Sequence, residues 1–209
     1  MSMSDKFARL FEAERTARQI HRELVSANAQ AVLTAIRQEM IALGALAAEE
    51  RALRLVRICA ILGNLSGDEP VDILIDILNV DAPEARLAAG EALEGIAFER
   101  FKEVALGCER ALKRLPQDAP ALVELPYIIG EVAEGGVVKL LGHFLKAKEA
   151  DVVAAAIEAL VEVEDPAAIP LLKPLQGDAR MVELEEEADA VSIGSLASEA
   201  CEILEGTEE

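Results

Sequence analysis

Apolar side chains recur every three or four positions along most of the chain, which is the period of an α-helix. In residues 71–80 they are Val71, Leu74, Ile75 and Leu78, and in residues 137–147 they are Val137, Leu140, Leu141, Phe144 and Leu145. We find no stretch with the strict alternation and turn signals of a half-buried strand. The pattern predicts an all-α protein in which each helix buries one apolar stripe.

Turn and capping residues separate these stretches. Pro70, Pro83 and Pro166 each follow an acidic turn, in a position suited to the first turn of a helix, where the missing N–H costs nothing. The boundaries predict separate helices over residues 71–80, 99–114, 137–147, 167–176 and 192–204. Pro126 falls inside a helical pattern and predicts a kink.

Four segments repeat one motif at a nearly constant spacing. They are ICAILGNL at 58–65, AGEALEGIA at 89–97, YIIGEVA at 127–133 and AAIEALVEV at 155–163. Aligning Gly63, Gly95, Gly130 and Glu162 gives steps of 32, 35 and 32 residues, which is long enough for two helices and two turns. We therefore expect an α-solenoid (α-α superhelix) of about four to five antiparallel helix pairs over residues 49–209, preceded by an N-terminal helical cap.

Two of these phrases resemble a known repeat family. DAPEARLAAGEALEGI at 81–96 resembles the second helix of the HEAT repeat, and DPAAIPLL at 165–172 resembles its first helix. The resemblance covers about residues 49–204. It implies a ladder along the stack, in which the Arg of one repeat reaches the Asp of a neighbouring repeat, and Asp81 and Arg86 match those roles. Asp118 and Asp151 have no Arg five positions on, so we expect an incomplete ladder.

Residues 1–48 do not follow the repeat. Phe7, Leu10, Phe11, Ile20 and Leu24 lie on a helical stripe, and residues 26–28 interrupt the pattern, so we expect two helices here. Our first interpretation is a cap over the end of the stack. The alternatives are a docking helix that forms a homodimer and, less favoured because its basic residues are mixed with acidic ones, a membrane-binding helix.

The chain carries a large and uneven negative charge. Lys and Arg total 20 against 39 Asp and Glu, for a net charge of -19, and residues 1–60 hold 9 of the basic and only 7 of the acidic residues. Such a field repels phosphate, so we expect no nucleic acid and no membrane surface as partner. It attracts a basic protein surface, or it serves solubility alone.

The last repeat contains an acidic insertion at about residues 177–191. It carries Glu183, Glu185, Glu186 and Glu187, which are candidates to attract a basic partner; the alternatives are a solvated loop and weak Ca²⁺ binding without the spacing of an EF-hand.

Catalytic and metal-binding motifs are missing from the sequence. The histidines, His21 and His143, are far apart, and Cys59, Cys108 and Cys201 show no CxxC spacing and lie in apolar helical stretches. No phosphate-binding loop or nucleophile elbow is present. We expect buried reduced thiols, no metal, no cofactor and no catalytic residue, and therefore not an enzyme.

The favoured function is a non-catalytic scaffold that binds another protein, with a basic surface, across the face formed by the second helix of each pair. Its expected contacts are the insertion glutamates named above together with Glu84, Glu91, Glu94, Glu124, Glu131 and Glu158. The alternative is a lyase-like or accessory subunit of an enzyme, with a small ligand in a groove lined by Tyr127, His143 and Cys108. Because we find no apolar segment of signal-peptide or membrane-span length, we expect a cytoplasmic protein.

Overall fold

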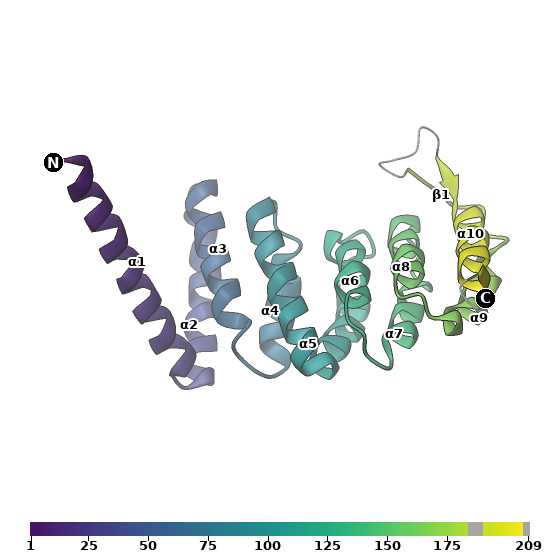
Figure 1. Ribbon diagram of the computed structural model, residues 1–209, viewed down its shortest axis with the longest axis horizontal. Helices are drawn as coiled ribbons and strands as arrows, with labels where there is room; N and C mark the ends of the chain where they lie inside the picture. The colour runs from purple at the N-terminus through teal and green to yellow at the C-terminus, as the bar shows by residue number, and fades with distance from the viewer. Residues whose placement is uncertain (184–189, 207–209) are drawn as a thin grey trace.

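A computed structural model describes residues 1–183 and 190–206, and in them the protein is all-α, as the apolar pattern predicts (Figure 1). The helices are α1 (Met3–Ser26), α2 (Ala29–Ala42), α3 (Ala48–Leu62), α4 (Asp68–Ile77), α5 (Pro83–Arg114), α6 (Pro120–Gly130), α7 (Val137–Phe144), α8 (Ala150–Glu162), α9 (Ile169–Leu172) and α10 (Ile193–Gly206), with 3₁₀ turns η1 (Leu43–Ala45), η2 (Pro166–Ala168) and η3 (Lys173–Leu175). The strands β1 (Met181–Val182) and β2 (Val191–Ser192), which the sequence did not indicate, pair antiparallel at the base of the predicted insertion.

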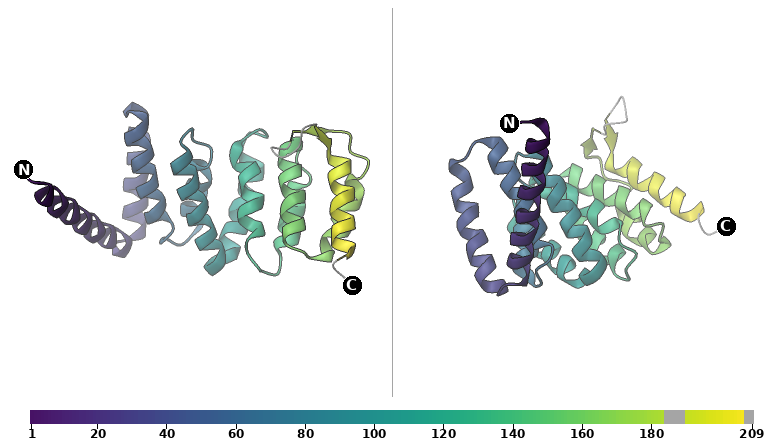
Figure 2. Two further views of the ribbon diagram at one scale, coloured as in Figure 1. Left: turned by 45° about the horizontal axis from the view of Figure 1, so that its top comes forward. Right: turned by 60° about the vertical axis from the view of Figure 1, so that its left-hand side comes forward.

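The helices from α2 to α10 stand side by side in a row, two layers deep (Figures 1 and 2). One layer contains α3, the first half of α5, then α6, α8 and α10; α3 packs on α5, α5 on α6, α6 on α8, and α8 on α10. The other layer contains α2, α4, the second half of α5, α7 and α9. Each helix of one layer thus buries its apolar stripe against helices of the other.

The predicted helix over residues 99–114 is not separate, because α5 runs from Pro83 to Arg114 with a break in helical geometry at Arg100 (φ -143°, ψ 50°). No Gly or Pro lies at this point to end the first half. The Arg100 guanidinium donates to the Leu65 carbonyl oxygen at 3.2 Å and lies 3.3 Å from a Glu103 carboxylate oxygen, which fixes the break. The break carries the chain from one layer to the other. In α6, by contrast, the helix continues across Pro126.

The predicted helix over residues 167–176 is divided into η2, α9 and η3. Pro166, Pro170 and Pro174 are spaced four residues apart, and each lacks the N–H that an α-helical bond requires. Short 3₁₀ turns accommodate this spacing where a continuous α-helix cannot.

The core is built almost entirely from Leu, Ile, Val and Ala, and no polar or charged residue of the described chain is fully buried. Small side chains allow the helices of the α3-to-α10 layer to approach closely: a Cβ on Gly130 of α6 would lie 3.4 Å from the Cβ of Ala159 in α8. Cys59, Cys108 and Cys201 are free and buried, and burial raises the pKa of the Cys59 and Cys108 thiols to about 12. Both thiols are therefore protonated and weakly nucleophilic at neutral pH.

The two N-terminal helices differ in packing. α2, whose N-cap is Asn28, buries Val32, Leu33 and Ile36 in the core. α1 ends at Ser26, within the interruption that the sequence indicates, and buries no residue.

Candidate protein-binding groove

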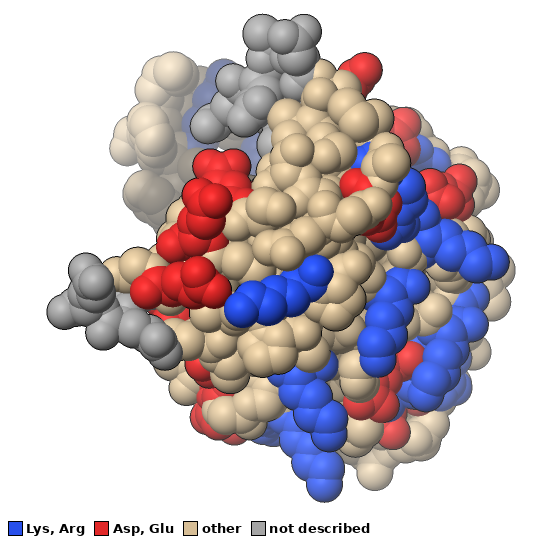
Figure 3. All heavy atoms as spheres, turned by 90° about the vertical axis from the view of Figure 1, so that its right-hand side faces the viewer, with Lys and Arg blue, Asp and Glu red and all other residues tan. Residues whose placement is uncertain are grey.

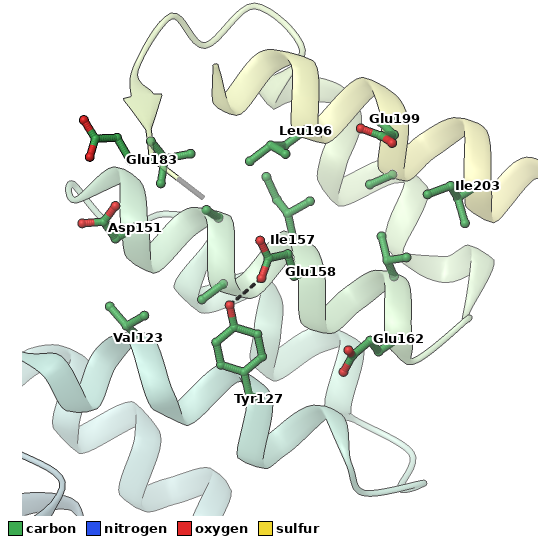
Figure 4. A pocket seen from close by; sticks show the side chains of 15 residues that line it. Val123, Tyr127, Asp151, Ile157, Glu158, Glu162, Glu183, Leu196, Glu199 and Ile203 are labelled. Carbon is green, nitrogen blue, oxygen red and sulfur yellow. Dashed lines mark hydrogen bonds between the residues drawn. The ribbon is translucent and has the colours of Figure 1, made fainter. Parts of the chain in front are cut away.

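Two adjoining hollows lie on the layer formed by α3, the first half of α5, α6, α8 and α10. The larger, of about 790 Å³, lies between α6, α8 and α10 (Figure 4), and the smaller, of about 450 Å³, lies between α5 and α6. Tyr127 lines both, so the two hollows adjoin, and together they involve four helices of this layer. We call the two hollows together the groove.

The floor of the groove is apolar. In the larger hollow it consists of Val123, Ala154, Ala155, Ile157, Val161, Val182, Leu196, Ala200 and Ile203, and in the smaller of Leu87, Gly90 and Ile128. The small residues leave room that Leu or Phe would fill. Leu87 is 66% exposed, Ile203 46% and Tyr127 38%, so large apolar side chains face solvent along its whole length.

Carboxylates surround this floor. Asp151, Glu158, Glu162, Glu183 and Glu199 line the larger hollow, and Glu91, Glu94, Glu124 and Glu131 line the smaller. The basic side chain among the lining residues is Arg86, which forms an ion pair with Glu124. The groove is therefore acidic at its edge and apolar at its centre.

The other layer carries basic residues that are paired with acidic ones. Arg110 lies 3.0 Å from Asp72 and Arg114 lies 2.6 Å from Asp76, each pair joining α4 to the second half of α5. Figure 3, which looks along the row from the α10 end, shows Asp and Glu with few Lys or Arg on one side, and Lys and Arg interspersed with Asp and Glu on the other. The two sides of the row therefore differ in charge.

Burial and neighbouring carboxylates change the chemistry of two groove residues. Partial burial raises the pKa of Glu94, and repulsion from Glu131 and Glu91 raises it further. Burial also raises the pKa of Tyr127 far above its ordinary value, with the carboxylate of Glu158 adding to the effect. The Tyr127 hydroxyl therefore stays protonated and donates to Glu158 Oε2 at 2.5 Å (Figure 4).

Replacing Glu94 with glutamine is expected to increase the free energy of unfolding by about 0.2–0.5 kcal/mol at pH 7, since it removes repulsion between like charges. Because the folded-state pKa of Glu94 is raised, the native state binds more protons than the unfolded state, and the wild type gains stability as pH falls through that pKa. The advantage of Glu94→Gln should therefore vanish below about pH 4. Urea denaturation of the wild type and of Glu94→Gln, at pH 7 and below about pH 4, measures this difference in the free energy of unfolding.

The matched control is Glu84→Gln. Glu84 lies in the first turn of α5, where the helix dipole favours a negative charge, so this change should lower stability slightly. An equal gain from both variants would contradict the local origin of the effect and indicate that only net charge matters.

The structure brings most of the predicted contact residues together. Glu91, Glu94, Glu124, Glu131, Glu158 and Glu183 line the groove. Glu84 is exposed but lines neither hollow, because it begins α5 at the edge of the layer. The predicted contacts Glu185, Glu186 and Glu187 lie outside the described residues.

Other residues that the sequence indicated lie elsewhere. Cys108 is buried in the core, and Nδ1 of His143 lies 3.9 Å from Glu109 in the α4-containing layer, so neither joins Tyr127 in the groove. Arg86 has a different partner from the one the HEAT resemblance implies. It contacts Glu124 of the next helix pair rather than an aspartate, and Asp81 is exposed in the preceding turn.

Sequence reasoning missed Asp151, Glu162 and Glu199 at the edge and Leu87 and Ile203 on the floor. Glu162 follows Glu158 by one helical turn, so the period that selected Glu158 also pointed to it. Leu87 and Ile203 gave no such signal, because an exposed leucine or isoleucine in a helical pattern cannot be distinguished from a core residue by spacing alone.

Comparison with known proteins assigns no family. No protein-family model matches the chain, and no curated protein matches it. Two crystal structures of engineered proteins from the Northeast Structural Genomics Consortium are similar: one at 20% identity and a TM-score of 0.33, covering 92% of this chain and 90% of that chain, and one at 19% and 0.36, covering 93% and 92%. Neither likeness is close enough to carry an argument about fold or function.

Residues 1–183 and 190–206 contain no group of three or more His, Cys, Asp or Glu placed to hold one metal ion. Within the same residues, no helix has the length and apolar character needed to cross a membrane.

Proposed function

We propose that the protein is a non-catalytic α-solenoid scaffold, related to HEAT-repeat proteins, which binds a basic amphipathic segment of a protein partner in the groove. The observation that carries the proposal is the groove itself: two adjoining hollows with apolar lining on four helices, edged among the described residues by nine carboxylates and by one arginine that is already paired. An amphipathic helix with basic residues beside its apolar stripe matches both properties.

The solenoid architecture is supported by the way neighbouring helices are joined. Arg86 of α5 reaches Glu124 of α6 in one layer, and Arg110 and Arg114 of α5 reach Asp72 and Asp76 of α4 in the other. Ion pairs thus join neighbouring helices within each layer, as stacked helix pairs require. The two-layered row of α2 to α10 is consistent with such a stack (Figure 1).

The two parts of the groove have different roles in binding. Exposed ion pairs contribute only about 0.2–1 kcal/mol each to the binding free energy. The carboxylates therefore mainly accelerate association and favour a partner with a positively charged surface. The apolar floor provides most of the binding free energy, at about 25 cal/mol for each Å² of apolar surface that the partner covers. A polar basic peptide without an apolar stripe should therefore bind weakly.

A synthetic amphipathic helix of leucine and lysine, about 20 residues long and free of Tyr and Trp, tests the proposal. The chain has no Trp and one tyrosine, Tyr127 in the groove, so intrinsic fluorescence reports binding at this site. We expect saturable binding that weakens as salt is raised. A scrambled peptide of the same composition, lacking the stripe, should bind at least about tenfold more weakly.

Two charge-matched variants locate the binding site. Glu131→Lys with Glu162→Lys changes the groove, whereas Asp81→Lys with Glu84→Lys makes the same change of charge at exposed residues outside it. The groove variant should lose about tenfold in affinity or more, and the control less than about threefold. Equal losses in the two variants, or no binding by the wild type, would overturn the proposal.

A further inference from the structure

Helix α1 has an apolar face that nothing in the described part of the chain covers. None of its 24 residues is buried. Five of its large apolar side chains are 50–70% exposed, namely Met3 70%, Phe7 57%, Leu10 60%, Phe11 59% and Ile20 50%, whereas Leu24 near α2 is half-buried. Figures 1 and 2 show α1 slanting away from the row, with its C-terminal end nearest to α2. In proteins most of the stabilisation of an amphipathic helix comes from covering its apolar face, and this face is left open.

The charges of α1 are ordered around this face. At about 100° per residue, Met3, Phe7, Leu10, Ala17 and Leu24 form one stripe. Lys6 and Arg9 lie along one side of the stripe, Arg15, Arg18 and Arg22 lie along the other, and Asp5, Glu12 and Glu23 lie on the opposite face. Glu14 falls within the stripe and is paired with Arg18 at 3.1 Å.

This arrangement is the complement of the groove. An apolar stripe placed on the floor formed around Tyr127 brings both rows of basic side chains to the edge carboxylates and leaves the acidic face in solvent. The lengths also agree. A helix of 24 residues is about 36 Å long, and the groove crosses α5, α6, α8 and α10, whose three interaxial distances of 8–10 Å add up to about 24–30 Å between the outer axes.

The groove of the same copy is out of reach. α1 is joined to α2 through Ala27 and Asn28 and lies at one end of the row, whereas α8 and α10 lie at the other end (Figure 1). A second copy meets no such limit. Within α1 there are five basic and four acidic side chains, which leaves 15 basic and 35 acidic for the rest of the chain. Two such bodies repel one another, so α1 is the element suited to join them.

We propose that α1 of one copy of the protein docks in the groove of a second copy. The inference rests on the groove of the proposed function and identifies an occupant for it. Reciprocal docking of two copies closes a dimer with twofold symmetry, and one-way docking extends a chain of copies. In either case the docked helix competes with other basic amphipathic segments for the groove.

Light scattering of the full chain after size exclusion, over a range of protein and salt concentrations, tests the inference. The wild type should show a mass above the 22.3 kDa of one copy, falling as salt is raised. Phe7→Ser with Leu10→Ser should weaken association at least about tenfold. Ile41→Ser, at a residue of α2 that is 83% exposed, is the control and should leave the mass unchanged. Because all three residues are exposed, circular dichroism should show native helix content in each variant.

Mixing two variants identifies the docking surface. One carries Arg15→Glu, Arg18→Glu and Arg22→Glu in α1, and the other carries Glu131→Lys and Glu162→Lys in the groove. Each alone should be monomeric, and the mixture should form a 1:1 complex, because the first has an intact groove and the second an intact α1. A groove variant that still associates like the wild type would overturn the inference and indicate that α1 pairs with α1.

Two further outcomes would also overturn it. One is a wild type that is monomeric at every concentration. The other is a wild type that stays monomeric and binds vesicles of anionic phospholipid through α1, which would make α1 a membrane-surface helix. If the leucine–lysine peptide still binds the groove in these cases, the proposed function stands while this inference fails. If the peptide does not bind, both fail.

Discussion

Replacing Phe144 with alanine is expected to lower the free energy of unfolding by about 3–5 kcal/mol. Phe144 is the largest of the fully buried side chains and ends α7, which supports α8 beneath the groove. The core that contains Phe144 is built mostly of Leu, Ile, Val and Ala on closely packed helices, so it cannot collapse to fill the cavity. Urea denaturation followed by circular dichroism at 222 nm measures the loss.

Phe98→Ala is the matched control. Phe98 lies on α5 and is 62% exposed, so the same truncation should change stability by less than about 0.5 kcal/mol. Similar losses in the two variants would contradict the packing of α7 described above. Peptide binding should follow stability. The Phe98→Ala variant should bind the peptide like the wild type, whereas the Phe144→Ala variant should lose peptide binding at lower urea concentrations than the wild type.

Replacing Gly194 with alanine is expected to cost about 2–3 kcal/mol. A Cβ on Gly194 would lie 2.6 Å from the carbonyl oxygen of Gln176 and 3.0 Å from that of Asp178. Both neighbours are backbone atoms, and the N–H of Gly194 donates to the Asp178 oxygen at 2.9 Å, so the chain cannot separate without losing this bond. The start of α10 should therefore shift, and with it one wall of the groove.

Gly95→Ala provides the comparison. Gly95 lies within α5, and a Cβ added there would have open space around it, so alanine should stabilise the helix by about 0.5–1 kcal/mol. Thermal denaturation of both variants measures these opposite changes. A Gly194→Ala protein as stable as the wild type would show that α10 does not approach residues 176–178 as closely as described.

Local features of the sequence account for the helices and for much of the groove. The period of apolar residues predicted an all-α chain, and Pro83 and Pro120 each lie at the start of a helix. The same period grouped Glu91, Glu124 and Glu158 on one face of their helices, and they line one groove. These predictions succeeded because helix formation, and the face of the helix on which a residue lies, depend on neighbours within one or two turns.

Local features failed where contacts between distant residues decide the result. The break at Arg100 depends on Leu65, 35 residues earlier, and the partner of Arg86 is Glu124, 38 residues later. No pattern within a few turns contains this information.

The sequence by itself therefore determined that the chain is helical, where most of its helices begin and that its three thiols are buried. Only the tertiary structure decided that α1 lies apart from the core with its apolar stripe exposed, and that Leu87, Tyr127 and Ile203 form the floor of a groove. The physical reason is that an amphipathic pattern fixes which face of a helix is apolar, whereas the arrangement of the other helices fixes whether that face is covered.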